Sequence, residues 1–222
     1  IYFDDDTITI NRRHMLALCD EYRSRNFGIP WSCMGNAVID SDIIAAMAKA
    51  GCRAIKFGVE SADPEVLRQI PKVQDPDDVK RTVQDLNRHG IQSHANFLFG
   101  LPGETELSAR RTIEYAVNLG TQTLQFAIAT PYPGTAFYAR AEREGWLTKT
   151  DWRQFDPAGE AVVSYPNYSA ETIAQMHDLA WKRWQRHMML HRPRTLMHHF
   201  GNAYRRQGFG GMARLGYYGA SR

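Results

Sequence analysis

The chain alternates short apolar runs with longer segments whose apolar residues recur every three or four positions. The short runs are rich in β-branched and aromatic residues and predict strands, whereas the longer segments predict amphipathic helices. Asp63-Pro64 and Asp75-Pro76 each place a capping acid before a first-turn proline, which is typical of a helix start. The predicted strands cover residues 1–4, 30–34, 54–59, 94–99 and 123–129, and the predicted helices cover residues 12–27, 41–50, 63–70, 76–89, 104–119 and 134–144.

Five successive strand-and-helix units predict a parallel sheet. Runs such as AIKFGV and FLFG are apolar without clean alternation, which indicates strands buried on both faces. Right-handed crossovers then leave two architectures, a doubly wound sheet and a (β/α) barrel. In both architectures ligands bind at the C-terminal ends of the strands, so the functional residues are expected there.

The repeating pattern stops after Gly145, and the rest of the chain has a different character. A loop rich in aromatic residues and proline precedes a long helix, which begins after Ser169, ends near Leu190 and is expected to cover the barrel. Residues 181–222 contain one Lys, eight Arg and no acidic residue, although the whole chain has a net charge of only +3. We therefore expect three segments: a core at 1–147, a loop plus covering helix at 148–191, and a basic, flexible tail at 192–222.

Composition places the chain among ordinary soluble proteins, with 222 residues and 43% hydrophobic content. No apolar run approaches the roughly 20 residues that a membrane-spanning helix needs, so no transmembrane segment is predicted. Three cysteines, Cys19, Cys33 and Cys52, are far apart and lack metal-site spacing. They are typical of buried structural thiols in a reducing compartment, which predicts a cytoplasmic protein.

Polar and glycine residues gather where the predicted strands end. Carboxylates at such an edge suit a ribose diol or an ammonium group, so they favour a nucleoside or amino-acid-like ligand. Each element also has a plain structural interpretation, as a strand-end turn, a helix cap, a tight turn or rim packing. The residues in question are Asp4–Asp6, Asn36, Glu60, Ser61, the GLPGET segment from Gly100, Thr130 and Tyr132.

Five segments in this order and spacing resemble the radical S-adenosylmethionine (SAM) enzymes. They are FDDDTIT, WSCMGN, AGCRAIKFGVESADPEVL, HGIQSHANFLFGLPGET and QFAIATPYPGTAFYARAEREGWL. The resemblance is greatest to the branch whose members usually carry an N-terminal cobalamin-binding domain. It covers residues 1–147 and, more loosely, the chain to about 190.

The resemblance implies strands 2–6 of a partial (β/α)6 TIM-like barrel. It also implies reductive cleavage of SAM at a 4Fe-4S cluster, which yields a 5′-deoxyadenosyl radical. That radical would serve methyl transfer, oxidative cyclisation or a related modification of a small-molecule or lipid-like substrate. An electron donor such as flavodoxin or ferredoxin and, from the branch, cobalamin are further implied partners.

The same resemblance assigns roles near the amino acid and ribose parts of SAM. It places Asp5 and Asp6 at the SAM amino group. Glu60 and Ser61 would contact the ribose and the methionine portion. Lys72 stands where the family often has a basic residue, near the SAM carboxylate.

The remaining roles concern the adenine and the substrate. Phe97 to Gly100, together with Glu104, match a motif that lies against the adenine in the family. Ala127 and Thr130 would close the adenine pocket. The substrate rim would include Tyr132 and Asn36, the latter replacing an Arg found in many relatives.

The chain departs from the family at the cluster. The CxxxCxxC signature is absent from the sequence, so no metal site is expected in this chain. We expect the first barrel strand, the cluster loop and any cobalamin domain to lie upstream of Ile1. The chain alone is therefore expected to be inactive.

Three other interpretations stay open at this point. Asp4–Asp6 could hold Mn²⁺ or Mg²⁺ in a nucleotide-sugar transferase. The basic tail could make the chain a non-catalytic module that binds nucleic acid or an anionic surface, although nucleic acid is the less favoured partner. The histidines could form a zinc site, in which His187 and His191 are four residues apart on one helix and His198 and His199 follow it.

Overall fold

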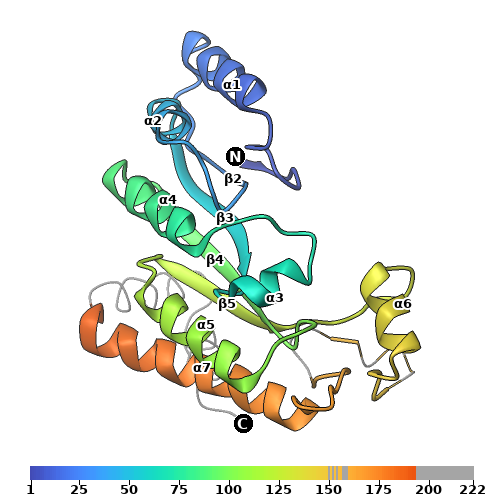
Figure 1. The fold of residues 1–222 in the computed structure, drawn as a ribbon. Helices are drawn as coiled ribbons and strands as arrows, with labels where there is room; N and C mark the ends of the chain where they lie inside the picture. The colour runs from blue at the N-terminus through green and yellow to red at the C-terminus, as the bar shows by residue number, and fades with distance from the viewer. Residues whose placement is uncertain (150, 152, 154, 157–159, 194–222) are drawn as a thin grey trace.

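The computed structural model describes residues 1–149, 151, 153, 155, 156 and 160–193. These residues form a five-stranded sheet in which each strand is parallel to its neighbours and the order follows the chain, β1-β2-β3-β4-β5 (Figure 1). The strands are β1 (Tyr2–Phe3), β2 (Trp31–Met34), β3 (Cys52–Glu60), β4 (Gln92–Phe99) and β5 (Thr123–Ile128).

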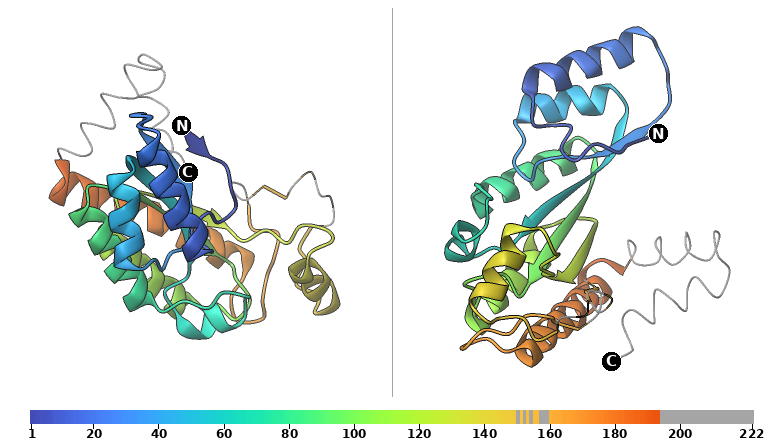
Figure 2. Two further views of the ribbon diagram at one scale, coloured as in Figure 1. Left: turned by 90° about the horizontal axis from the view of Figure 1, so that it is seen from above. Right: turned by 90° about the vertical axis from the view of Figure 1, so that its right-hand side faces the viewer.

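Most of the helices cover one face of this sheet. They are α1 (Arg12–Ser24), α2 (Ser41–Lys49), α3 (Pro64–Arg68), α4 (Pro76–Arg88), α5 (Glu106–Asn118), α6 (Ala136–Arg143) and α7 (Ala170–His191). In Figures 1 and 2, α1, α2, α4, α5 and α7 follow one another along the sheet, and α6 stands apart from this layer. A sequential strand order with its helices on one face is the progression of a barrel, so the doubly wound alternative was wrong and the partial barrel is confirmed.

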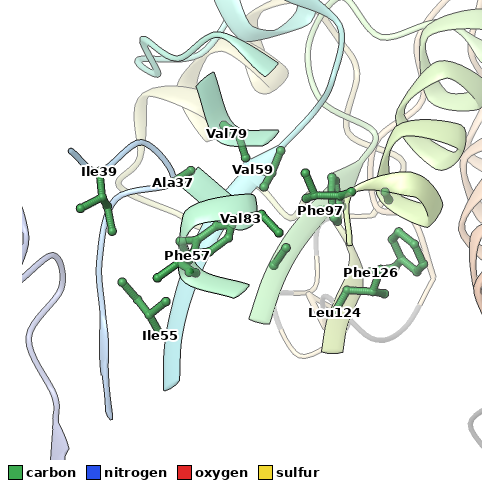
Figure 3. Close-up of a cluster of buried hydrophobic side chains, with 14 of the residues drawn as sticks. Ala37, Ile39, Ile55, Phe57, Val59, Val79, Val83, Phe97, Leu124 and Phe126 are labelled. Carbon is green, nitrogen blue, oxygen red and sulfur yellow. The ribbon is translucent and has the colours of Figure 1, made fainter. Parts of the chain in front are cut away.

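The core lies between the sheet and this helical layer. On β3, Ile55, Phe57 and Val59 are buried and approach Val79 and Val83 of α4 (Figure 3). Burying each such side chain contributes about 1.5–3 kcal/mol. Because side chains alternate along a strand, the intervening residues of β3 lie on the opposite face, which we call the inner face.

Side-chain caps set the starts of several helices. The carboxylates of Asp63 and Asp75 accept the backbone N–H groups of Glu65 and Asp77, as the Asp-Pro pairs predicted. Thr105 and Ser108 form a reciprocal capping box at α5. Caps of this kind typically contribute about 1 kcal/mol each.

The segment after α6 returns to the sheet. Helix α7 packs against α5 and β5, and its buried residues are Ile173, Met176, Ala180, Trp184 and Met188. The segment boundaries at 147 and 191 stay a prediction, and the basic tail lies almost entirely outside the described residues. Within the described part, no helix is both long and apolar enough to cross a membrane. All three cysteines are buried and unpaired, as expected.

Candidate functional site

The carboxyl ends of the five strands meet at one edge of the sheet, and the predicted site residues follow them. Asp4–Asp6, after β1, are exposed, and the Asp5 carboxylate accepts the Thr7 N–H at 3.0 Å. The chain then runs beside the end of β2, where Thr9 Oγ1 accepts the Asn36 N–H at 2.8 Å. The acidic segment is therefore a strand-end turn whose carboxylates face solvent at this edge.

Glu60, at the end of β3, has an unusual backbone conformation. Its φ angle is +64°, and the pairing with β4 shifts register between Gly58 and Glu60. Residues other than glycine seldom adopt positive φ, and such strain concentrates at functional sites. The Glu60 carboxylate accepts the Lys72 ammonium at 3.0 Å, and the two side chains are 19% and 31% exposed.

Gly58 makes room for this ion pair. A Cβ atom at Gly58 would lie 2.9 Å from Lys72 Nζ and still closer to the Glu60 carboxylate. The carboxylate is therefore folded back over the inner face of β3, at the mouth of the barrel. The arrangement presents an anion and a cation side by side, both partly accessible.

The GLPGET turn after β4 is built around Glu104. Gly100 and Gly103 have φ angles of +83° and +79°, which glycine adopts without penalty. Glu104 is only 4% exposed, and its carboxylate accepts the Gly100 N–H. Burial raises the pKa of Glu104 to about 8, outweighing the opposing hydrogen bonds from Gly100 and Leu101.

The segment before α7 holds this turn from outside. The Tyr165 hydroxyl donates to the Gly100 carbonyl at 2.8 Å, and Ile173 lies within 3.2 Å of where a Cβ at Gly100 would be. Tyr168 lies beside the Glu104 carboxylate. The turn is thus fixed by side chains that follow it by more than 60 residues.

The structure divides the predicted SAM residues into two groups. Phe97 packs on the helical side against Tyr115 and Phe126, and the buried Ser61 hydroxyl lies 3.2 Å from that of Thr112. With Glu104, these side chains point into the protein, so only their backbone is available to a ligand. Side chains at or near the open edge are those of Asp5, Asp6, Asn36, Glu60, Ala127, Thr130 and Tyr132. All of these roles stay predictions.

Comparison with known proteins decides the family. The profile described as "Radical SAM superfamily" matches residues 8–116. The chain belongs to the radical SAM superfamily. This membership contradicts the nucleotide-sugar transferase interpretation. Binding of an anionic partner by the basic tail stays a prediction, because that tail lies almost entirely outside the described residues.

Proteins similar to this chain include methyltransferases and a cyclase. An uncharacterised methyltransferase of Pyrococcus horikoshii is 29% identical over 79% of this chain and 38% of its own length. The anaerobic magnesium-protoporphyrin IX monomethyl ester cyclase of Rubrivivax gelatinosus is 27% identical over 58% of this chain and 24% of its own length. The radical SAM chain thus spans well under half of these relatives.

Among solved structures, the methyltransferase TsrM from Kitasatospora setae, with cobalamin and a [4Fe-4S] cluster bound, has the same fold. The TM-score is 0.61 at 19% identity, covering 79% of this chain and 37% of that one. At this identity the likeness concerns the fold, and it confirms that the five-stranded sheet is a radical SAM barrel segment.

The residues of this chain suit SAM but not the iron–sulfur cluster. The Glu60–Lys72 pair and the glycine turn offer groups suited to the ribose, ammonium and carboxylate of SAM. The cysteines do not suit an iron–sulfur cluster, because all three are buried, and burial raises the pKa of Cys19 to about 11. Across the described ranges no three His, Cys, Asp or Glu side chains gather into a metal site, and the His187–His191 pair gains no third ligand there. The other two histidines of that candidate site, His198 and His199, lie outside the described residues.

One group of polar residues was missed by the sequence analysis. Lys56, His94, Asn96, Thr123 and Gln125 occupy the inner face of β3, β4 and β5, opposite the buried core residues. His94 Nδ1 and Thr123 Oγ1 are 2.7 Å apart. The signal was available, because polar residues at every second position of otherwise apolar strands indicate a face that does not pack on the helices.

Proposed function

We propose that this chain forms the SAM-facing part of a radical SAM catalytic barrel. In the complete protein, bound SAM would be cleaved reductively beside a 4Fe-4S cluster to supply the 5′-deoxyadenosyl radical for methyl transfer, cyclisation or a related modification. The cluster ligands would come from outside this chain. The strained Glu60, held over Gly58 and paired with Lys72, is the observation that carries the proposal.

The charges of Glu60 and Lys72 complement groups on SAM. Its ribose and ammonium groups donate hydrogen bonds, and its carboxylate is an anion. A carboxylate accepts strong hydrogen bonds from a ribose diol or an ammonium group, and Glu60, at the barrel mouth, would accept them from SAM. Lys72 would pair with the SAM carboxylate, exchanging its present partner for the ligand. Asp5 and Asp6, exposed at the same edge, would receive the SAM amino group.

The glycine turn would serve the adenine through its backbone. Its two positive-φ glycines keep side chains away from the edge, and Glu104 fixes the loop from within. Ala127 is a small residue on the inner face of β5, and Thr130 follows the strand end. Such small and backbone surfaces suit a flat aromatic base.

The wider setting follows from the relatives and is proposed with it. Several relatives are methyltransferases, and TsrM was solved with cobalamin, which supports cobalamin as a second cofactor of the complete protein. We further expect a small-molecule or lipid-like substrate, a cytoplasmic location and an electron donor of the flavodoxin or ferredoxin kind.

Replacing Glu60 tests the proposal directly. Glu60→Gln removes the charge while keeping the shape, so SAM affinity should fall about 10- to 100-fold, the effect of losing one charge-assisted hydrogen bond. The affinity is measured by equilibrium dialysis, and release of 5′-deoxyadenosine is measured in the complete, cluster-loaded enzyme. Glu106→Gln is the matched control, because Glu106 is exposed and paired with Arg110 on α5. Equal SAM affinity and cleavage in wild type and Glu60→Gln would contradict the assignment.

A further inference from the structure

The inner face of the sheet carries a lysine, Lys56, that has no ion-pair partner among the described residues. Lys56 lies on β3 between two buried core residues, Ile55 and Phe57, which point to the helices (Figure 3). Its own side chain therefore faces the barrel interior, where it is half-buried. In register, Met34 of β2 lies on one side of Lys56 and His94 of β4 on the other.

The neighbouring strands supply no counter-charge. Among the described residues, the inner-face positions of β2 to β5 hold one carboxylate, that of Glu60, and it already pairs with Lys72 at 3.0 Å. No ion pair joins Lys56 to any carboxylate in this part of the chain. A partly buried ammonium without a partner is costly, and lysine is seldom buried unless paired. A bound anion would remove that cost.

His94 adds a second polar group beside Lys56. Its Nδ1 is engaged with Thr123 Oγ1 at 2.7 Å, while its Nε2 is enclosed and has no hydrogen-bond partner among the described residues. The Asn96 Oδ1 atom, two residues further along β4, is also enclosed and unpaired there. Burial, reinforced by Lys56, outweighs the opposing interaction with the Asn96 side chain and lowers the pKa of His94, so the imidazole is largely neutral at pH 7. In the tautomer in which Nδ1 accepts from the Thr123 hydroxyl, Nε2 carries the proton and can donate it in a hydrogen bond.

We propose that Lys56, supported by His94, binds an anionic group of the substrate, a carboxylate or a phosphate, inside the barrel. This inference rests on the proposed function, because it takes the inner face to be the substrate chamber. Lys56 would supply the charge, and His94 Nε2–H would supply an oriented hydrogen bond. Both groups lie deeper along the strands than Glu60, so the SAM-facing pair and the anion subsite are separate.

The test titrates the chain with inorganic phosphate and, separately, with propionate, following the His94 ring by NMR. Resonances of His94 are assigned with His94→Gln. We expect one of the two anions to shift the His94 resonances in a saturable way. Which anion does so shows whether the site takes a phosphate or a carboxylate. In Lys56→Met the dissociation constant should rise at least about tenfold. Lys80→Met, which removes an exposed lysine on α4, is the matched control and should respond as wild type does.

Two results would overturn the proposal: no saturable response to either anion, or an unchanged response in Lys56→Met. Circular dichroism checks that the variants fold, and Lys56→Gln provides a second variant if the methionine destabilises the sheet. SAM affinity, measured on the same proteins, separates the two proposals. Lys56→Met should leave SAM affinity unchanged. If the protein binds anions at Lys56 but its SAM binding does not depend on Glu60, only the proposed function is refuted.

Discussion

The buried Glu104 carboxyl should make the stability of the protein fall as the pH rises. In the unfolded chain this group ionises near its ordinary pKa of 4.5, whereas in the folded protein the pKa is about 8. Between these values the folded state holds a proton that the unfolded state has lost. Stability therefore decreases with increasing pH across that window, by roughly 3–5 kcal/mol at about 1.4 kcal/mol per pKa unit.

Glu104→Gln isolates this effect. The glutamine keeps an oxygen that accepts the Gly100 N–H but cannot ionise, so the pH dependence between 5 and 9 should flatten. Urea unfolding followed by circular dichroism at several pH values measures the free energy of unfolding. Glu106→Gln, a change to an exposed neighbour, should retain the wild-type profile. The reasoning fails if wild type is equally stable at pH 5 and pH 9, or if Glu104→Gln keeps the wild-type slope.

Two glycine substitutions should separate binding from stability. Gly58→Ala displaces only the ends of the Glu60 and Lys72 side chains, so the free energy of unfolding should fall by about 1 kcal/mol or less while SAM affinity falls tenfold or more. A stability loss without an affinity loss would show that the ion pair does not face SAM. Gly35→Ala places a methyl group 2.8 Å from Ile55 Cδ1, so overpacking should cost about 1–3 kcal/mol. Unchanged urea midpoints would contradict that estimate.

Most of the fold could be predicted because apolar periodicity and turn residues agree along the chain. Each predicted strand overlaps an observed one, and the errors lie at the ends. The first helix was predicted to residue 27, because Gly28 resembled its terminating residue. It ends at Ser24, because Asn26 itself adopts a positive φ of 49°. Asparagine tolerates this conformation, and nothing in the sequence shows which of the two residues takes it first.

The site was less predictable, because the direction of each side chain depends on the phase of its strand. The sequence placed Glu60, Ser61 and Glu104 at the correct edge. It did not show that Ser61 and Glu104 turn inward or that Glu60 adopts a positive φ after a register shift. The family resemblance alone placed Phe97 near the ligand, whereas the alternation of β4, with His94 and Asn96 polar, puts its side chain on the helical side, where it is buried.

The hydrogen bond between Tyr165 and Gly100 has a consequence for protein engineering. Relatives in this superfamily differ in what they modify, and exchanging their C-terminal segments is an obvious way to recombine specificities. The bond ties such a segment to the glycine turn after β4, far earlier in the chain. A chimera joined after β5 would therefore take Gly100 from one parent and Tyr165 from the other, and the two parents would have to be compatible at this contact. A junction before β4 would take both residues from the same parent.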